Sequence, residues 1–341
     1  MNALAPEPTA AEWQATLPDV VTDLAWSPDQ KYLAAVSASG DLAVFEAESG
    51  AQVCRVLAHQ LGALRVSWGA ALATAGQDGK VKWWEDISRK LLREEKGGAA
   101  WVENLAWSPD RKLLASASGK FLRVWDNEGA LIFSFDNHAS TIAAIAWRPD
   151  SRGVASACYG AVNLFRLEES EPYETLAWRG SLISLAWSPN ARYVAAGSQE
   201  ASLRFWRLPY RPEQELEMTG YPQKIKLLAW DCASRFLATG GAGETIMVWD
   251  VSGKGPAGKR PKVLRGHQAK VSALLFQKDG DLLVSGDRAG EVCLWQPAKT
   301  SAVRNSFETG AEITALALTK RKLTVGNLDG RIVTRDLSRA G

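Results

Sequence analysis

The stretch VTDLAWSPD, residues 21–29, decides the fold because it returns along the chain at a nearly constant interval. It recurs as VENLAWSPD from residue 102, IAAIAWRPD from 142 and LISLAWSPN from 182, with weaker copies that begin at 63, 225, 271 and 313. The sixth position of each copy serves as an anchor, and the anchors lie 39 to 46 residues apart: Trp26, Trp68, Trp107, Trp147, Trp187, Trp230, Phe276 and Leu318. A period of this length indicates a repeat architecture, and the copies define eight units.

Each unit contains short apolar runs in a fixed order, as in VENLAW, KLLASAS, FLRVWD and ALIFSF of unit three. Runs of four to seven residues rich in Val, Ile, Leu, Trp and Phe, separated by Pro/Asp and Gly turns, predict antiparallel strands joined by hairpins. The first run of a unit is apolar on both faces, so neighbouring sheets must cover it on both sides. Sheets stacked radially in a ring provide this cover. We therefore predict an all-β protein with one ring of four-stranded antiparallel sheets.

The two ends of the chain complement each other. The last unit ends after its third strand, whereas AEWQATLP near the N-terminus precedes the first anchor without a partner. We expect a closing strand at about 12–18 to pair with the last unit, which removes an exposed sheet edge. The predicted repeat units are about 20–60, 61–98, 99–138, 139–178, 179–221, 222–267, 268–309 and 310–338 of a single domain, 1–341.

These units resemble the WD40 family of β-propellers over about residues 12–338. The matching motifs are the repeated WSPD, WD at Trp125-Asp126 and Trp249-Asp250, WE at Trp84-Glu85, and GH at Gly266-His267. The resemblance implies a propeller whose sheets form the blades. Eight units predict eight blades, with the seven blades that are common in the family as the alternative.

The three histidines, His59, His138 and His267, each lie nine residues before an anchor, which is the GH position of the family. The resemblance implies that such a histidine bonds a turn Asp and a Ser or Thr that meets a strand Trp, in a buried polar network. Only unit two carries every member at the expected positions. The predicted structural network is His59, Thr74, Asp78 and Trp84.

This placement of the histidines argues against catalysis. No pair of histidines converges, no cysteines cluster, and no Ser is spaced to join a His and an acid, so we predict no catalytic residues, no metal and no cofactor. The four cysteines are widely spaced and are expected to be small buried side chains in a reducing compartment, the cytoplasm. They are Cys54, Cys158, Cys232 and Cys293.

Charge and apolar patterning limit the class of partner. The chain has 40 basic and 38 acidic residues, which gives no overall field to attract nucleic acid or an anionic membrane. It contains neither an export signal at its start nor a run of 18 apolar residues. The stretch GKGPAGK, residues 253–259, resembles the start of a phosphate-binding loop, but Arg260 follows where Ser or Thr is needed. We expect no nucleotide there, only a solvated connection at the bottom rim.

The resemblance also implies a binding face. Partner contacts in the family come from residues four and six places before the anchor, together with a residue just before the turn Asp, all on the top rim. The four-before positions include Thr22, Glu103, Lys226, Ser272 and Thr314. Two features stand out among these positions: Trp101 lies beside the charged Glu103, and the basic residues of units six and seven form an arc. The predicted partner-binding set is Trp101, Glu103, Lys224, Lys226, Lys270, Arg288, Glu312 and Gln77.

The sequence therefore predicts a non-enzymatic scaffold, a single monomeric ring that acts as a subunit and docks a protein or peptide, acidic or of mixed charge, on its top face. The alternative is a propeller enzyme or a binder of small molecules or ions that uses the top of the central channel.

Overall fold

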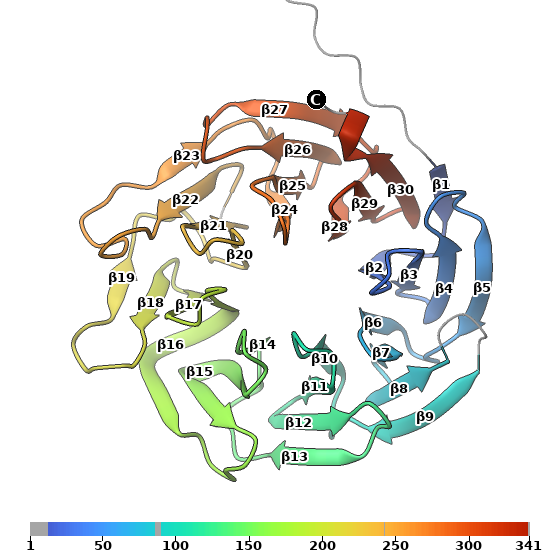
Figure 1. Cartoon of the computed structure of the whole chain (residues 1–341), viewed down its shortest axis with the longest axis horizontal. Helices are drawn as coiled ribbons and strands as arrows, with labels where there is room; N and C mark the ends of the chain where they lie inside the picture. Colours follow the sequence, from blue (N-terminus) through green and yellow to red (C-terminus); the bar gives the residue numbers. More distant parts are fainter. Residues whose placement is uncertain (1–12, 86–89, 242, 340–341) are drawn as a thin grey trace, which may run out of the picture.

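The computed structural model describes residues 13–85, 90–241 and 243–339, and in these residues the strands β1 to β30 are arranged in a ring (Figure 1). The described part of the chain has one short 3-10 helix, η1 (Leu337–Arg339). None of its helices has the length and apolarity needed to span a bilayer. The prediction of an all-β propeller is confirmed.

Five sheets contain four strands that follow one another along the chain and pair in that order. They are β2 (Val21–Trp26), β3 (Tyr32–Ser37), β4 (Asp41–Glu46) and β5 (Gln52–Leu57); β6 (Ala63–Trp68), β7 (Leu72–Gly76), β8 (Lys80–Trp84) and β9 (Leu91–Lys96); β10 (Val102–Trp107), β11 (Leu113–Ser118), β12 (Phe121–Asp126) and β13 (Leu131–Phe135); β20 (Leu227–Trp230), β21 (Phe236–Gly240), β22 (Ile246–Asp250) and β23 (Lys262–Leu264); β24 (Val271–Phe276), β25 (Leu283–Asp287), β26 (Glu291–Trp295) and β27 (Val303–Glu308).

The sixth sheet corrects the blade count. It has six strands: β14 (Ala144–Trp147), β15 (Gly153–Arg166), β16 (Glu174–Trp187), β17 (Tyr193–Ser198), β18 (Leu203–Arg207) and β19 (Leu216–Met218). The long strand β16 pairs with β15 through its first part and with β17 through its second part, which joins units four and five. With the closing sheet, the strands form seven hydrogen-bonded sheets. The prediction of eight separate four-stranded blades is wrong. The structure has seven blades, the number given as the alternative.

The physical reason lies at two places, one inside unit four and one at the boundary between units four and five. At residues 158–161 and 178–181 no turn interrupts the strands, and the pairing only shifts in register. Strands β15 and β16 therefore each continue for 14 residues. The first strands of all eight units nevertheless surround the centre of the ring, because the second part of β16 serves unit five (Figure 1).

The ring closes through its N-terminal strand, as predicted. In the seventh sheet β1 (Trp13–Thr16) pairs with β30 (Arg331–Asp336), which follows β28 (Ile313–Leu318) and β29 (Lys322–Asn327). Trp13 is buried, its indole N–H donates to the carbonyl oxygen of Ala47 at 2.9 Å, and its ring stacks on Phe45. The closing strand therefore completes the last sheet and also covers the first.

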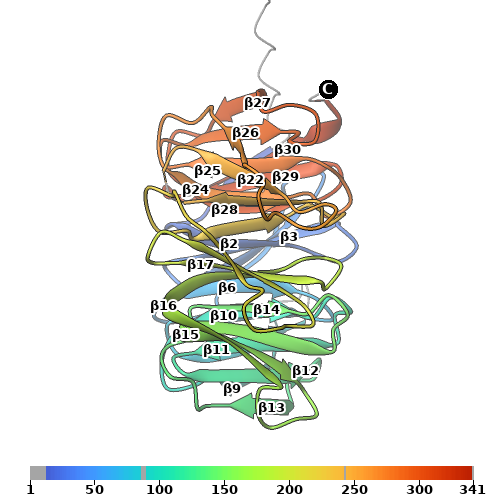
Figure 2. The same cartoon turned by 90° about the vertical axis from the view of Figure 1, so that its left-hand side faces the viewer.

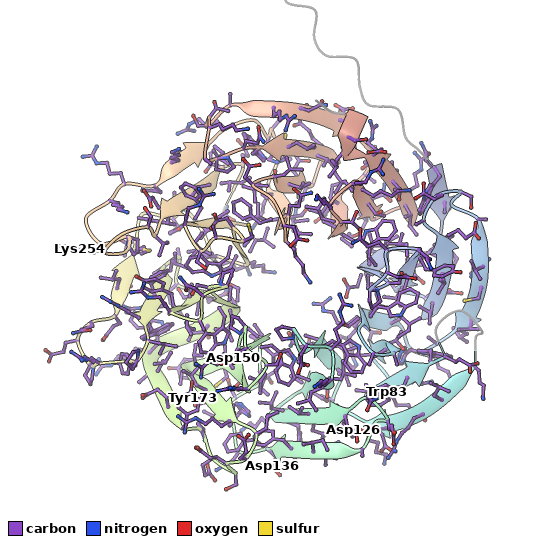
Figure 3. The ribbon with its side chains drawn as sticks, in the orientation of Figure 1. Trp83, Asp126, Asp136, Asp150, Tyr173 and Lys254 are labelled. Carbon is purple, nitrogen blue, oxygen red and sulfur yellow. The ribbon has the colours of Figure 1, made fainter. Side chains whose placement is uncertain are left out.

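Seen from the side, the ring is a disc with two rims (Figure 2). The turns between second and third strands and the connections into each first strand share one rim, called the top rim here. The apolar core lies between neighbouring sheets: Trp83 of β8, labelled in Figure 3, is fully buried and meets Trp125 of β12 edge to face at 5.7 Å. Core contacts between sheets leave the rims free to carry function.

Candidate functional site

The network expected in unit two is joined by hydrogen bonds. His59 Nδ1 lies 2.8 Å from Asp78 Oδ1, His59 Nε2 lies 2.9 Å from Thr74 Oγ1, and the Trp84 indole N–H donates to the same hydroxyl at 2.9 Å. Burial raises the pKa of Asp78, but the hydrogen bond and charge of His59, the backbone N–H of Lys80 and the charge of Lys82 together outweigh it, so the pKa is lowered overall. These four residues link the top turn of the blade to its strands.

Unit seven contains a second complete network, so the prediction that unit two alone is complete is wrong. His267 Nδ1 lies 3.0 Å from Asp287 Oδ2, His267 Nε2 lies 2.6 Å from Ser285 Oγ, and the Trp295 indole donates to Ser285. In unit two the turn Asp, Asp78, lies six residues before Trp84, and the same spacing before Trp295 falls on Ala289 in unit seven. Asp287 stands two residues before that position. The Asp in SGDRAG could have indicated this network from the sequence. It was overlooked because it does not fall at the position that the spacing of the family motif assigns to the turn Asp.

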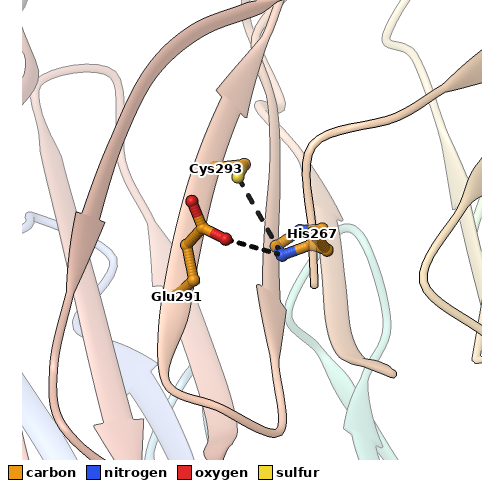
Figure 4. A group of neighbouring side chains, drawn as sticks. All are labelled: His267, Glu291 and Cys293. Carbon is orange, nitrogen blue, oxygen red and sulfur yellow. Dashed lines mark hydrogen bonds and ion pairs between the residues drawn. The ribbon is translucent and has the colours of Figure 1, made fainter. Parts of the chain in front are cut away.

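A cluster in unit seven has the composition of a metal site (Figure 4). Nδ1 of His267 lies 4.0 Å from Glu291 Oε2 and 3.9 Å from Cys293 Sγ. Both nitrogens of the imidazole are already bonded, to Asp287 and Ser285, so the ring has no free lone pair in this arrangement. Burial also raises the pKa of the Cys293 thiol, which keeps it protonated, whereas a metal ligand is a thiolate. The cluster belongs to the hydrogen-bonded network.

Unit six builds a shorter network, without a turn Asp, in which a tyrosine takes the place of the histidine. The Tyr221 hydroxyl lies 2.9 Å from Thr239 Oγ1 and accepts the Trp249 indole N–H at 2.7 Å. Burial raises the pKa of Tyr221 to about 12, so it stays neutral. This position is therefore structural in unit six as well.

Trp101 of the predicted partner-binding set follows a connection that is fixed by hydrogen bonds and close packing. The backbone N–H of Gly97 donates to Gly79 at 2.8 Å, and the Ser118 hydroxyl donates to the carbonyl oxygen of Ala100 at 2.6 Å. Gly98 packs so closely on Ser118 that a Cβ there would lie 2.7 Å from the Ser118 Cβ. These contacts fix the chain up to the residue before Trp101.

Trp101 and Glu103 both reach the solvent, because Val102 between them is fully buried and side chains alternate along a strand. Trp101 is 51% exposed. The pairing of β10 with β11 shifts register between Val102 and Asn104, so Glu103 occupies a β-bulge, a feature that re-aims side chains. Within the described residues Glu103 forms no ion pair.

Three predicted residues meet in one pocket of about 680 Å³, which we call the Trp101 pocket. Gln77 comes from the top turn of unit two, and Trp101 and Glu103 come from unit three. Thr141 of unit four adds to the wall, as do Lys80 and Lys96. The pocket thus lies on the top rim at the junction of units two and three.

The other predicted residues form a separate group across the centre of the ring, on the side of β20 and β24 (Figure 1). Burial lowers the pKa of Lys270, and the neighbouring charges of Arg288, Lys226 and Lys224 lower it further, which shows that these four cations face one region. We call them the basic arc. Arg288 is not free, because its Nε lies 3.3 Å from Glu312 Oε1.

Three of the four-before positions hold neighbouring units together instead of projecting to a partner. The hydroxyls of Thr22, Ser272 and Thr314 donate to carbonyl oxygens of the next unit at 2.6–2.7 Å. The acceptors are Ala63, Ile313 and Val21. A Ser or Thr side chain at the bulge is short enough for its hydroxyl to bond the neighbouring first strand, whereas Glu103 at the same position has no hydroxyl to donate.

The stretch 253–259 leads into strand β23 and into no helix, so it lacks the helix N-terminus of a phosphate loop. Lys259 Nζ donates to the Ser252 carbonyl oxygen at 2.8 Å and lies 3.2 Å from Asp250, so it ties the loop to itself. Lys254 lies at the outer edge of the ring (Figure 3). One expectation for the cysteines is also wrong: Cys232 is exposed, because it follows the anchor strand in a surface turn.

The comparisons with known proteins agree with this geometry. The family model "WD domain, G-beta repeat" matches residues 12–46, 89–126, 129–165, 171–207, 213–250 and 258–296. The chain is 33% identical over 101 residues to Protein ROOT INITIATION DEFECTIVE 3 of Arabidopsis thaliana, covering 29% of this chain and 22% of that protein. It is 23% identical over 133 residues to THO complex subunit 3 of Arabidopsis thaliana, covering 38% of this chain and 42% of that protein.

The chain therefore spans less than half the length of these relatives. The crystal structure of the computationally designed Ika8 protein has a similar fold, with a TM-score of 0.82, 21% identity, and coverage of 94% of this chain and 97% of the designed one. The family model covers most of the chain, and its repeats coincide with the observed strands. This chain belongs to the WD40 family of β-propeller proteins.

Proposed function

We propose that the protein is a non-enzymatic interaction platform that docks a protein segment of acidic or mixed charge on its top rim. The observation that carries the proposal is Trp101, which is half exposed and yet lines a concave site beside Glu103 and Gln77. Fully buried contact with a large aromatic side chain dominates the energy of many interfaces, and Trp leads such sites. Propellers host many functions, so this site, not the fold, supports the proposal.

The state of the histidines favours binding over catalysis. Both ring nitrogens of His59, His138 and His267 are bonded to neighbouring protein atoms. A general base needs a nitrogen that can reach the substrate proton. None of these three rings offers one in the observed arrangement.

The basic arc supplies the attraction for acidic groups. Lys224 and Lys226 form no ion pair among the described residues, and Lys270 bonds only a neutral amide, that of Gln223, at 3.0 Å. Charges on a rim of this kind act mainly by steering association, which depends on salt.

We also propose that the ring acts as a subunit of a larger complex in the cytoplasm. One relative, THO complex subunit 3 of Arabidopsis thaliana, is by its name a subunit of a complex, which supports the first part. The exposed thiol of Cys232 is easier to maintain in a reducing compartment, which supports the second. Size-exclusion chromatography of native extracts and subcellular fractionation check these two statements.

The experiment is affinity purification from the native host, followed by mass spectrometry. Trp101→Ala should reduce the affinity for the main partner about thirty-fold, since a hot-spot truncation costs about 2 kcal/mol or more. Lys224, Lys226 and Lys270 changed together to Glu should slow association. Leu57→Ala, an exposed apolar change on an outer strand, is the control. If both test variants recover the partner as well as the parent does, the top rim is not the docking site, and the bottom-rim segment 254–262 replaces it.

A further inference from the structure

The Trp101 pocket continues over the rim into a second hollow on the outer wall. This second hollow, of about 570 Å³, is lined by Arg93, Glu94 and Glu95 of β9 and by Arg123, Trp125 and Leu131 of unit three. Lys80 and Lys96 line both hollows. The two therefore meet at these lysines and form one groove between units two and three, which we call the interblade groove.

The outer end of the interblade groove combines charged side chains with one exposed leucine, Leu131. Strand β9 is the outermost strand of its sheet and has no buried residue, and β13 is the outermost strand of the next sheet. Their exposed apolar side chains are 41–52% accessible: Leu91, Leu92, Leu131 and Ile132. Of these four, Leu131 lines the hollow, and the other three lie on the two outer strands beside it. Exposed apolar side chains at a groove favour an interaction site there.

The charges change along the groove. Glu103 at the top end lines the same pocket as Trp101, and its carboxylate forms no ion pair with any residue that the structure describes. At the middle, the Lys80 ammonium bonds Glu94, whereas Lys96 forms no ion pair among the described residues. At the outer end, Arg93 lies 2.8 Å from Glu95, so these two charges satisfy each other. The Arg123 guanidinium also lines the outer hollow; it donates to the Lys96 carbonyl oxygen and forms no ion pair among the described residues. The charged groups without an ion-pair partner thus run from an anion, Glu103, to two cations, Lys96 and Arg123, beside Leu131.

We propose that the interblade groove binds an extended peptide segment of a partner protein, with a cationic side chain on Trp101 and Glu103, an acidic side chain at Lys96 and an apolar side chain near Leu131. A guanidinium or ammonium group is attracted both by the face of an indole and by a carboxylate. An extended chain presents successive side chains at regular intervals and fits a groove that crosses a rim. The proposal rests on the proposed function, because it assigns the chemistry of the segment that Trp101 docks.

The test uses a display library of linear twelve-residue peptides selected on the full-length protein. We expect at least tenfold enrichment of sequences in which an Arg or Lys is followed or preceded by an Asp or Glu and then by a Leu or Ile. Glu103→Lys should reverse the preference at the first position from basic to acidic. Glu168→Lys, an equal charge change on an exposed turn of unit four, should leave the preference unchanged.

Two results would overturn the proposal: no enrichment over a blank support, or the same enriched sequences with Trp101→Ala and Lys96→Glu as with the parent. Circular dichroism and melting curves on every variant separate lost binding from lost folding. If binding of the native partner still depends on Trp101 while no peptide is selected, the protein recognises a folded surface of its partner. Peptide binding in the interblade groove is then contradicted, but the proposed function is not. If Trp101→Ala binds the native partner as well as the parent does, the proposed function itself is contradicted.

Discussion

The top ends of the units are held together differently on the two sides of the ring. In units seven, eight and one, the bulged residue of the first strand is Ser272, Thr314 and Thr22 respectively, and its hydroxyl bonds the next unit. In units two, three and four the same position holds Leu64, Glu103 and Ala143, none of which carries a hydroxyl. The Trp101 pocket lies on this second side.

The difference shows how one repeated framework can separate stability from recognition. The side with hydroxyls also contains the junction where β1 closes the ring, which is the place where the ring would open. On the other side, bonds between units lie away from the bulge, as where the Trp147 indole donates to Ala106 at 2.8 Å. The bulge position there is free to carry a charge such as Glu103.

The largest effect should follow from removing the closing strand. Deletion of residues 1–18 removes the buried side chains of Trp13 and Leu17 and exposes an edge of β30. Loss of the Trp alone costs about 3–5 kcal/mol, so we expect aggregation or a large fall in melting temperature. Thermal melting and size-exclusion chromatography measure this, with deletion of residues 1–11 as the control that keeps β1. A deletion of 1–18 that melts like the parent would contradict the role of the closing strand.

The two complete networks, one on each side, should differ in strength. Asp287 and His267 have fully buried side chains, whereas the side chain of Asp78 is 13% exposed and water can replace part of it. Asp287→Ala should therefore destabilise by about 2–3 kcal/mol and Asp78→Ala by about 1–2 kcal/mol, since an unsatisfied buried partner costs about 1–3 kcal/mol. Urea unfolding midpoints give both values.

The exposed Asp329→Ala is the matched control for these two variants. Equal losses for Asp78→Ala and Asp287→Ala would show that burial does not set the strength of the network. An unchanged midpoint for either one would show that its network contributes nothing to stability.

The hydroxyl bonds should have a smaller effect. Thr314→Val keeps the shape of the side chain but removes the donor to the Val21 carbonyl oxygen, at a cost of about 1 kcal/mol. Thr314→Ser keeps the donor and should retain most of the stability. Denaturant unfolding of the three proteins tests this expectation. If Thr314→Ser loses as much as Thr314→Val, packing of the methyl group holds this junction and the hydrogen bond does not.

The sequence predicts the repeat, the strands and the closing strand well, because periodic apolar anchors and turn residues are local signals. The joining of units four and five was missed because β15 and β16 continue by shifts in register, which leave no mark as clear as a Pro/Asp turn. Asp287 was missed because it reaches the same hydrogen bond from a different place in the turn. Gln77, Trp101 and Glu103 were selected one by one, but their meeting in one pocket depends on three-dimensional positions of adjacent units.

The smallest effect concerns pH and lies on the side of the Trp101 pocket. His138 precedes the connection that carries Thr141 into the pocket wall, and burial lowers its pKa below the ordinary value of about 6.5. The unfolded chain then binds a proton at this residue near pH 6.5, whereas the folded protein binds it only at lower pH. Its contribution is therefore fully present above about pH 6.5 and is lost as the pH falls below that value. We expect the free energy of unfolding to fall more between pH 8 and pH 5 in the parent than in His138→Gln, which cannot titrate there. Parallel pH profiles for the two proteins would show that His138 takes up its proton equally in both states, and the pocket side would then be no more sensitive to acid than the side with hydroxyls.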